Sequence, residues 1–168
     1  MALIVEDGTG LSTAESYLSE TDADTYWSNR GDATWAAATT AAKEESLRRA
    51  TQYLDASFNW IGVIKSTTQA LNWPRAAAYD REDRSLADQV PTLVEQACAE
   101  LAKEALSGAL IATVSRDDRA KRVKAGSVEV EFEGGVSSQK SYALAALIVS
   151  PLVDGRYGGG AVVNLVKS

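Results

Sequence analysis

The stretch that most constrains the fold is residues 90–108, which reads as one amphipathic helix. Its apolar residues recur at three- and four-residue steps, as on one face of a helix. They are Val94, Ala97, Cys98, Leu101, Ala105 and Leu106. Pro91 suits the first helical position, and Gly108 suits the stop. Because many of these residues are small, neighbouring helices can approach closely, so we expect a mainly α fold built as a tight helical bundle.

Composition limits the class of protein. The chain has 168 residues, of which 45% are hydrophobic and 24% charged, as in a single globular domain. No run approaches the about 20 apolar residues of a membrane span, and the N-terminus does not resemble a signal peptide. We therefore expect no membrane partner. The net charge of −6 repels nucleic acid on average, so DNA binding would need a local basic patch.

The residue types of common catalytic and metal sites are scarce. The chain has no histidine, and Cys98 is its one cysteine. This composition excludes imidazole catalysis, histidine metal ligands and thiolate clusters. The glycines at 8–10 and 158–160 lack the residues that complete a nucleotide-binding loop. We expect no enzyme activity, no cofactor and no metal.

Three further helices are predicted. Ser19 and Thr21 are both suitable caps for a helix that ends at Gly31. Residues 40–57 carry an apolar stripe and, on the other face, acid–base pairs spaced four residues apart, which is typical of a surface helix. Residues 142–149 are apolar nearly all round, which predicts a short helix buried on several sides.

The segment 59–84 lacks regular periodicity and contains Trp60 and Trp73. Long irregular segments in compact domains often serve binding. The alternative is that both tryptophans cover the helical core. The sequence leaves both interpretations open.

Residues 119–133 carry the signal of a β-hairpin. Apolar and acidic residues alternate from Val128 to Glu133, as in a strand with one face in contact with an apolar surface. A two-residue turn at 126–127 predicts three facing pairs. These pairs are Lys124 with Glu129, Val123 with Val130, and Arg122 with Glu131. Because the charges match across the strands, the register accounts for these residues without a ligand.

A glycine hinge separates residues 1–153 from a C-terminal arm, residues 154–168. The arm ends in a β-prone apolar run that can add to the sheet edge of another chain. It can equally fold back beside Leu3–Val5. Both alternatives stay open.

Several motifs in a fixed order resemble a family of tailed-bacteriophage proteins encoded among head and neck genes. The strongest is the run 69–75, Gln-Ala-Leu-Asn-Trp-Pro-Arg; the others are 3–11, 14–17, 47–55 and Val90-Pro91 before its helix. The resemblance covers roughly residues 1–151. Lys65 stands where the family pattern leads us to expect arginine. Members of the family often carry the label DnaT-like, single-stranded-DNA-binding.

The resemblance implies a head-to-tail adaptor, a connector protein of the virion neck that is assembled in the host bacterial cytoplasm. Such adaptors form a homo-oligomeric ring, typically a dodecamer, beneath the portal protein. They bridge the portal to the next neck or tail component, a stopper or tail terminator. DNA passes through the channel without specific binding, which the acidic net charge suits. The implied shape is an α-helical bundle with a protruding hairpin and an extended terminal arm.

On this hypothesis two segments make the contacts. The arm is expected to bind the portal or a neighbouring subunit through Tyr157, Val162, Val163, Leu165 and Val166. The hairpin is expected at a contact between subunits or with the next ring, through Arg119, Lys121, Arg122, Lys124, Glu129 and Glu131.

The alternative hypothesis is a protein that binds single-stranded DNA. Such a site needs aromatic rings on which bases stack, beside basic side chains. Trp60, Lys65, Trp73 and Arg75 form one candidate group. A second group consists of the basic residues Arg116, Arg119, Lys121, Arg122 and Lys124.

Overall fold

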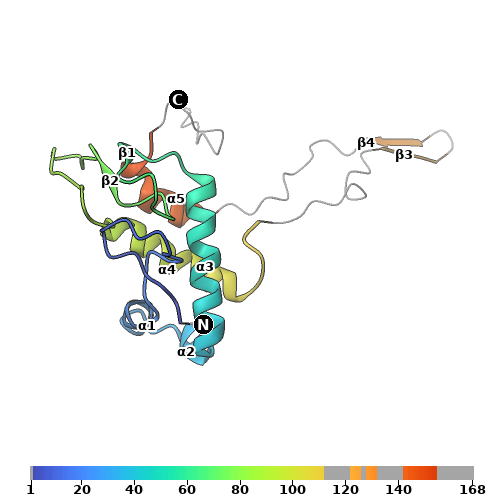
Figure 1. The fold of residues 1–168 in the computed structure, drawn as a ribbon. Coiled ribbons are helices and arrows are strands. Elements are labelled where there is room, and N and C mark those ends of the chain that lie inside the picture. The colour runs from blue at the N-terminus through green and yellow to red at the C-terminus, as the bar shows by residue number, and fades with distance from the viewer. Residues whose placement is uncertain (1, 112–121, 126–127, 132–141, 155–168) are drawn as a thin grey trace.

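Two crossing helices, α3 (Thr40–Ser57) and α4 (Thr92–Leu106), organise the fold (Figure 1). The computed structural model describes residues 2–111, 122–125, 128–131 and 142–154. The predicted face of α4 is buried except for Leu106, which is partly buried, and Ala99 and Ala102 are buried as well. The small residues let α3 approach closely, so that Thr51 Oγ1 lies 3.5 Å from Cys98 Sγ. Helix α4 is therefore enclosed on more than one side.

The ends of these helices follow local rules. Helix α3 begins and ends at the predicted residues, and the Thr39 hydroxyl accepts a hydrogen bond from the Ala42 N–H (3.3 Å). Pro91 is the N-cap of α4 rather than its first residue, since its ψ of 139° is extended. Gly108 follows the helix with a φ of 148°, a backbone conformation that favours glycine.

Two short helices precede α3. In α1 (Glu20–Ser28) Ser19 is the cap, and its Oγ accepts from the Asp22 N–H (3.0 Å). Helix α2 (Ala33–Ala37) was not predicted from the sequence, because five residues are too few to show a helical period. Asp32 caps α2 by accepting a hydrogen bond from the Trp35 N–H. The helix places the Trp35 side chain in the core, where it is 1% exposed.

Helix α5 (Ala143–Val149) lies against α4 and leads into a 3-10 turn, η2 (Ser150–Leu152). Ala145 and Val149 are buried. Leu144 and Leu147, however, are 56% and 68% exposed. The prediction that this helix is buried on several sides is therefore wrong, because α5 packs along one side only.

Among the described residues, four short strands form two separate two-stranded antiparallel sheets: β1 (Val63–Ile64) with β2 (Arg75–Ala76), and β3 (Arg122–Ala125) with β4 (Val128–Glu131). The register of β3 and β4 confirms the three pairs predicted from the sequence and adds Ala125 opposite Val128. In Figure 1 this hairpin stands apart from the helices. The fold is thus mainly α with a β-hairpin, as predicted.

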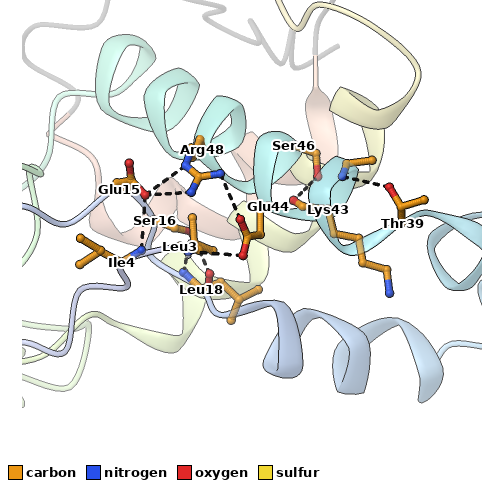
Figure 2. A network of polar contacts seen from close by, with 11 residues as sticks. Leu3, Ile4, Glu15, Ser16, Leu18, Thr39, Lys43, Glu44, Ser46 and Arg48 are labelled. Atoms are coloured by element: carbon orange, nitrogen blue, oxygen red, sulfur yellow. Dashed lines mark hydrogen bonds and ion pairs between the residues drawn. The ribbon is translucent and has the colours of Figure 1, made fainter. Parts of the chain in front are cut away.

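The N-terminal segment is fastened to α3 by polar contacts. Figure 2 shows Arg48 of α3 between two carboxylates, with 3.0 Å to Glu15 and 3.5 Å to Glu44. Glu44 also accepts from the Leu3 N–H (3.3 Å), and Glu15 from the Ile4 N–H (3.4 Å). The charged face of α3 is therefore not only in contact with water, because part of it binds the N-terminal segment.

The turn after this segment is organised around a buried side chain, Glu6, which is 4% exposed. Its carboxylate accepts from three backbone N–H groups: Gly8 (3.0 Å), Gly10 (2.8 Å) and Leu11 (2.9 Å). Gly8 has a φ of 92°, and a Cβ there would lie 2.5 Å from the Asp88 carbonyl oxygen. Glycine is therefore required where this turn meets the segment before α4.

Candidate partner-binding surface

The largest apolar side chains left exposed on a helix are on α5, beside a hollow of about 450 Å³ between α4 and α5. We call this hollow the α4/α5 groove. It is lined by Glu100, Leu101, Glu104, Tyr142, Ala143, Leu144 and Ala145. Helix α5 has no polar residue, so its exposed side is apolar throughout. A helix face of this kind is typical of a protein–protein contact.

One edge of the groove is acidic. Glu100 and Glu104 lie one turn apart on α4, where like charges repel. Glu100 accepts from the Tyr26 hydroxyl (2.7 Å), and burial together with this carboxylate raises the pKa of Tyr26 to about 12. Burial, followed by the Glu104 charge, raises the pKa of Tyr142. The edge is therefore a site of negative charge beside an apolar helix.

This surface was not predicted from the sequence. Residues 142–149 are apolar on every side, a pattern typical of a buried helix. The shortness of this segment could have indicated an exposed side, because a helix of seven residues packs against its neighbour along one side only. Leu144 and Leu147 are the candidate contact residues that this signal would have found, whereas Glu104 lies on α4 and is brought beside them only by the fold.

Three of the four candidate nucleic-acid residues, Trp60, Trp73 and Arg75, lie in the interior, whereas Lys65 is exposed. Trp60 and Trp73 are 6% and 0% exposed, and their rings meet edge to face with 6.0 Å between centroids. Neither ring presents a face to solvent for stacking. The structure therefore confirms the interpretation in which both tryptophans cover the helical core.

The two basic members of that group make internal contacts. Arg75, 9% exposed, donates to three carbonyl oxygens: Ile61 (2.7 Å), Gly62 (2.9 Å) and Asn72 (3.2 Å). Lys65 donates to the Gly8 carbonyl (3.1 Å) and pairs with Asp88 at 2.5 Å. Arg75 therefore holds the irregular segment 59–76 together, and Lys65 joins this segment to the turn at Gly8 and to the segment before α4.

A buried polar network anchors the same segment to α3. The Asp55 carboxylate accepts from the Tyr17 hydroxyl and from the Asn72 N–H (3.1 Å). The Tyr17 hydroxyl in turn accepts from the Trp73 N–H (3.2 Å). Burial raises the pKa of Asp55, and burial followed by the Asp55 charge raises that of Tyr17. The strongest sequence motif, residues 69–75, thus has a structural role in this chain.

The predicted contact residues of the hairpin and arm are only partly described. In β3 and β4 the backbone register places Arg122 opposite Glu131 and Lys124 opposite Glu129. Arg119 and Lys121 lie outside the described residues. The same is true of the arm positions Tyr157, Val162, Val163, Leu165 and Val166.

A second hollow, of about 480 Å³, lies between α1, α2 and α3. Its charged lining residues are paired within the protein. Asp24 accepts from the Trp35 indole N–H and from Lys43, each at 2.7 Å, and Asp32 pairs with Lys103. These contacts join the helices, and they account for the charges around the hollow without a ligand.

Within the described ranges, no group of three or more Cys, Asp or Glu side chains is arranged to hold a metal ion. Among the same residues, no helix combines the length and apolar character needed to cross a membrane.

Comparison with known proteins gives one match. A family model described as "Putative DnaT-like ssDNA binding protein" matches residues 1–168. No curated protein matches the chain, and no solved structure matches it. Because the match spans the whole sequence, this protein belongs to the family that carries the DnaT-like description.

Proposed function

We propose that this protein is a structural virion protein, a head-to-tail adaptor that forms a ring beneath the portal and bridges it to the next neck component. Its proposed partners are the portal protein, a stopper or tail terminator, and other copies of itself in a dodecamer. Its proposed place is the neck of the virion, after assembly in the bacterial cytoplasm.

The observation that carries this proposal is the exposed apolar side of α5. Leu144 and Leu147 are more than half exposed on a helix without polar residues, beside the α4/α5 groove. Exposed apolar surface of this kind favours contact with another protein chain over binding of a small polar substrate. The acidic net charge of −6 suits a channel through which DNA slides without adhering.

The test is the mass of the full-length protein, alone and mixed with its cognate portal, by native mass spectrometry. We expect a multi-copy complex on the portal. A protein that stays monomeric and ignores the portal would overturn the proposal. A matched pair of variants sharpens the test: Leu147→Asp on α5 should weaken the complex, whereas Glu82→Lys in the loop before α4 should not.

The arm has its own test. Deletion of residues 155–168 should leave the helical body folded, which far-UV circular dichroism checks, and should abolish docking to the portal. Unchanged docking would contradict the role of the arm and leave the adaptor function in place.

The second candidate function is single-stranded-DNA binding, which the description of the family favours. Trp60, Trp73 and Arg75 are buried and make internal contacts, which argues against them as the DNA-binding site. The basic residues of the second candidate group, Arg116, Arg119, Lys121, Arg122 and Lys124, are the remaining candidates. Fluorescence titration of a labelled oligonucleotide at low salt tests them: binding that weakens steeply with salt and is lost in Arg119→Ala/Lys121→Ala, but not in Arg49→Ala, would support this function.

A further inference from the structure

We propose that the α4/α5 groove receives the C-terminal arm, residues 156–167, of a second copy of this chain. The inference deepens the proposed function and rests on it, because it names the contact that links neighbouring subunits in the ring.

The first argument is apolar complementarity. The groove offers Ala143, Leu144 and the Tyr142 ring, and Leu147 continues the same exposed side of α5. The arm contains the run Ala161-Val162-Val163-Asn164-Leu165-Val166. Contact with the exposed side of α5 would remove the large apolar side chains of this run from water, which favours the docked state.

The second argument is charge complementarity. Glu100 and Glu104 lie at the groove, and in the described part of the chain neither forms an ion pair, since Lys103 between them pairs with Asp32. Residues 155–168 contain two cations, Arg156 and Lys167, and no acidic side chain. A cation brought to this edge relieves the repulsion between two carboxylates one turn apart.

The third argument is placement. The groove lies at the start of α5, at Tyr142–Ala145, whereas the arm departs after its end. There the Asp154 N–H donates to the Asn59 carbonyl (2.8 Å), and Val153 pairs antiparallel with Trp60. A subunit that carries a receiving surface at one end of α5 and a complementary segment leaving from the other end has the two different surfaces that a head-to-tail ring contact needs.

The experiment is disulfide cross-linking between two full-length single variants, Leu144→Cys and Val163→Cys, mixed in equal amounts with the portal present. Leu144 is exposed, so the substitution leaves the core intact. The native Cys98 is fully buried, and burial raises the pKa of its thiol to about 11, so it contributes little background. We expect a cross-linked dimer of one copy of each variant.

Two controls make the result specific. The pair Glu82→Cys and Val163→Cys places the first thiol on the exposed loop before α4 and should cross-link about tenfold more slowly, as expected for a contact without an effective local concentration. Glu104→Lys in the Leu144→Cys copy should slow the reaction, and Lys167→Glu in the Val163→Cys copy should restore it. Restoration by the reversed charge pair would not follow from loss of stability.

A dimer yield equal to that of the control pair would overturn the inference. So would a double variant, Leu144→Cys/Val163→Cys, that closes its disulfide within one chain and no longer exchanges arms. These outcomes are separable from the adaptor function itself. Portal binding without the cross-link would contradict the groove contact and leave the adaptor function in place. The cross-link without portal binding would contradict the adaptor function and leave the groove contact in place.

Discussion

The Tyr17 hydroxyl and the Asp55 carboxylate form a buried hydrogen bond that joins the segment before α1 to the last turn of α3. The same hydroxyl accepts from the Trp73 N–H, and the same carboxylate accepts from the Asn72 N–H. Two side chains thus connect three parts of the chain that lie far apart in sequence. The motif at 69–75 is held in position because these two groups accept hydrogen bonds from its backbone N–H groups.

Tyr17→Phe should lower the free energy of unfolding by about 1–3 kcal/mol, because it leaves the Trp73 N–H and a buried carboxylate short of a partner. Urea denaturation followed by tryptophan fluorescence measures the change. Tyr26→Phe is the matched control, since Tyr26 donates to Glu100 at the half-exposed edge of the groove. Equal losses in the two variants would contradict the importance of the buried network.

Arg75→Ala should destabilise the fold by about 2 kcal/mol or more, because three carbonyl oxygens lose their donor in a buried place. Arg49→Ala removes an exposed pair with Glu45 on α3 and should change stability by less than about 1 kcal/mol. The midpoints of thermal unfolding compare the two. If Arg75→Ala kept wild-type stability but lost oligonucleotide binding, Arg75 would be a nucleic-acid contact rather than a structural residue.

Gly62→Ala should be more damaging than Gly31→Ala, although both glycines have positive φ angles, 75° and 66°. A Cβ at Gly62 would lie 2.5 Å from the Ala76 carbonyl oxygen, whereas nothing lies within 4 Å of one at Gly31. We expect about 1 kcal/mol of backbone strain in both variants and a further loss at Gly62 from the displaced strand β2. Chemical denaturation of the two variants side by side tests this order.

Stability should fall as the solution is acidified. The hydrogen bond from Lys103, followed by that from the Trp35 N–H, lowers the pKa of Asp32, and the hydrogen bond from Arg48 lowers that of Glu15. Unfolding therefore takes up protons on these carboxylates, so their contribution is present above the unfolded pKa values and is lost as pH falls through the folded ones.

Asp32→Asn tests the assignment, because asparagine still caps α2 but carries no charge. The urea midpoint should drop less between about pH 7 and about pH 3 in this variant than in the wild type. A drop of the same size would show that the pair between Asp32 and Lys103 does not contribute to the pH dependence.

Much of the fold could be predicted where a pattern was long enough. Helix α3 has 18 residues, and its apolar stripe and the acid–base pairs of its outer face predicted its extent. The hairpin register followed from the turn length and the matching charges of β3 and β4. Helix α2 has five residues and depends on the tertiary contact of Trp35, so no local pattern could reveal it.

The candidate site was harder to predict because burial is a property of the whole fold. The apolar character of Leu144 and Leu147 reads the same whether a neighbour covers them or not. Tryptophan beside arginine likewise fits both a stacking site and a core contact. Only the fold shows that Trp73 is enclosed and that Arg75 donates to backbone carbonyls.

The turn around Glu6 bears on how this chain would meet a phosphate. Backbone N–H groups that converge in a glycine-containing turn form a concave site that binds anions in many proteins. Here the Gly8, Gly10 and Leu11 amides already donate to the Glu6 carboxylate. The chain thus carries its own anion in this turn, and a DNA phosphate would have to expel a buried carboxylate before it could bind there.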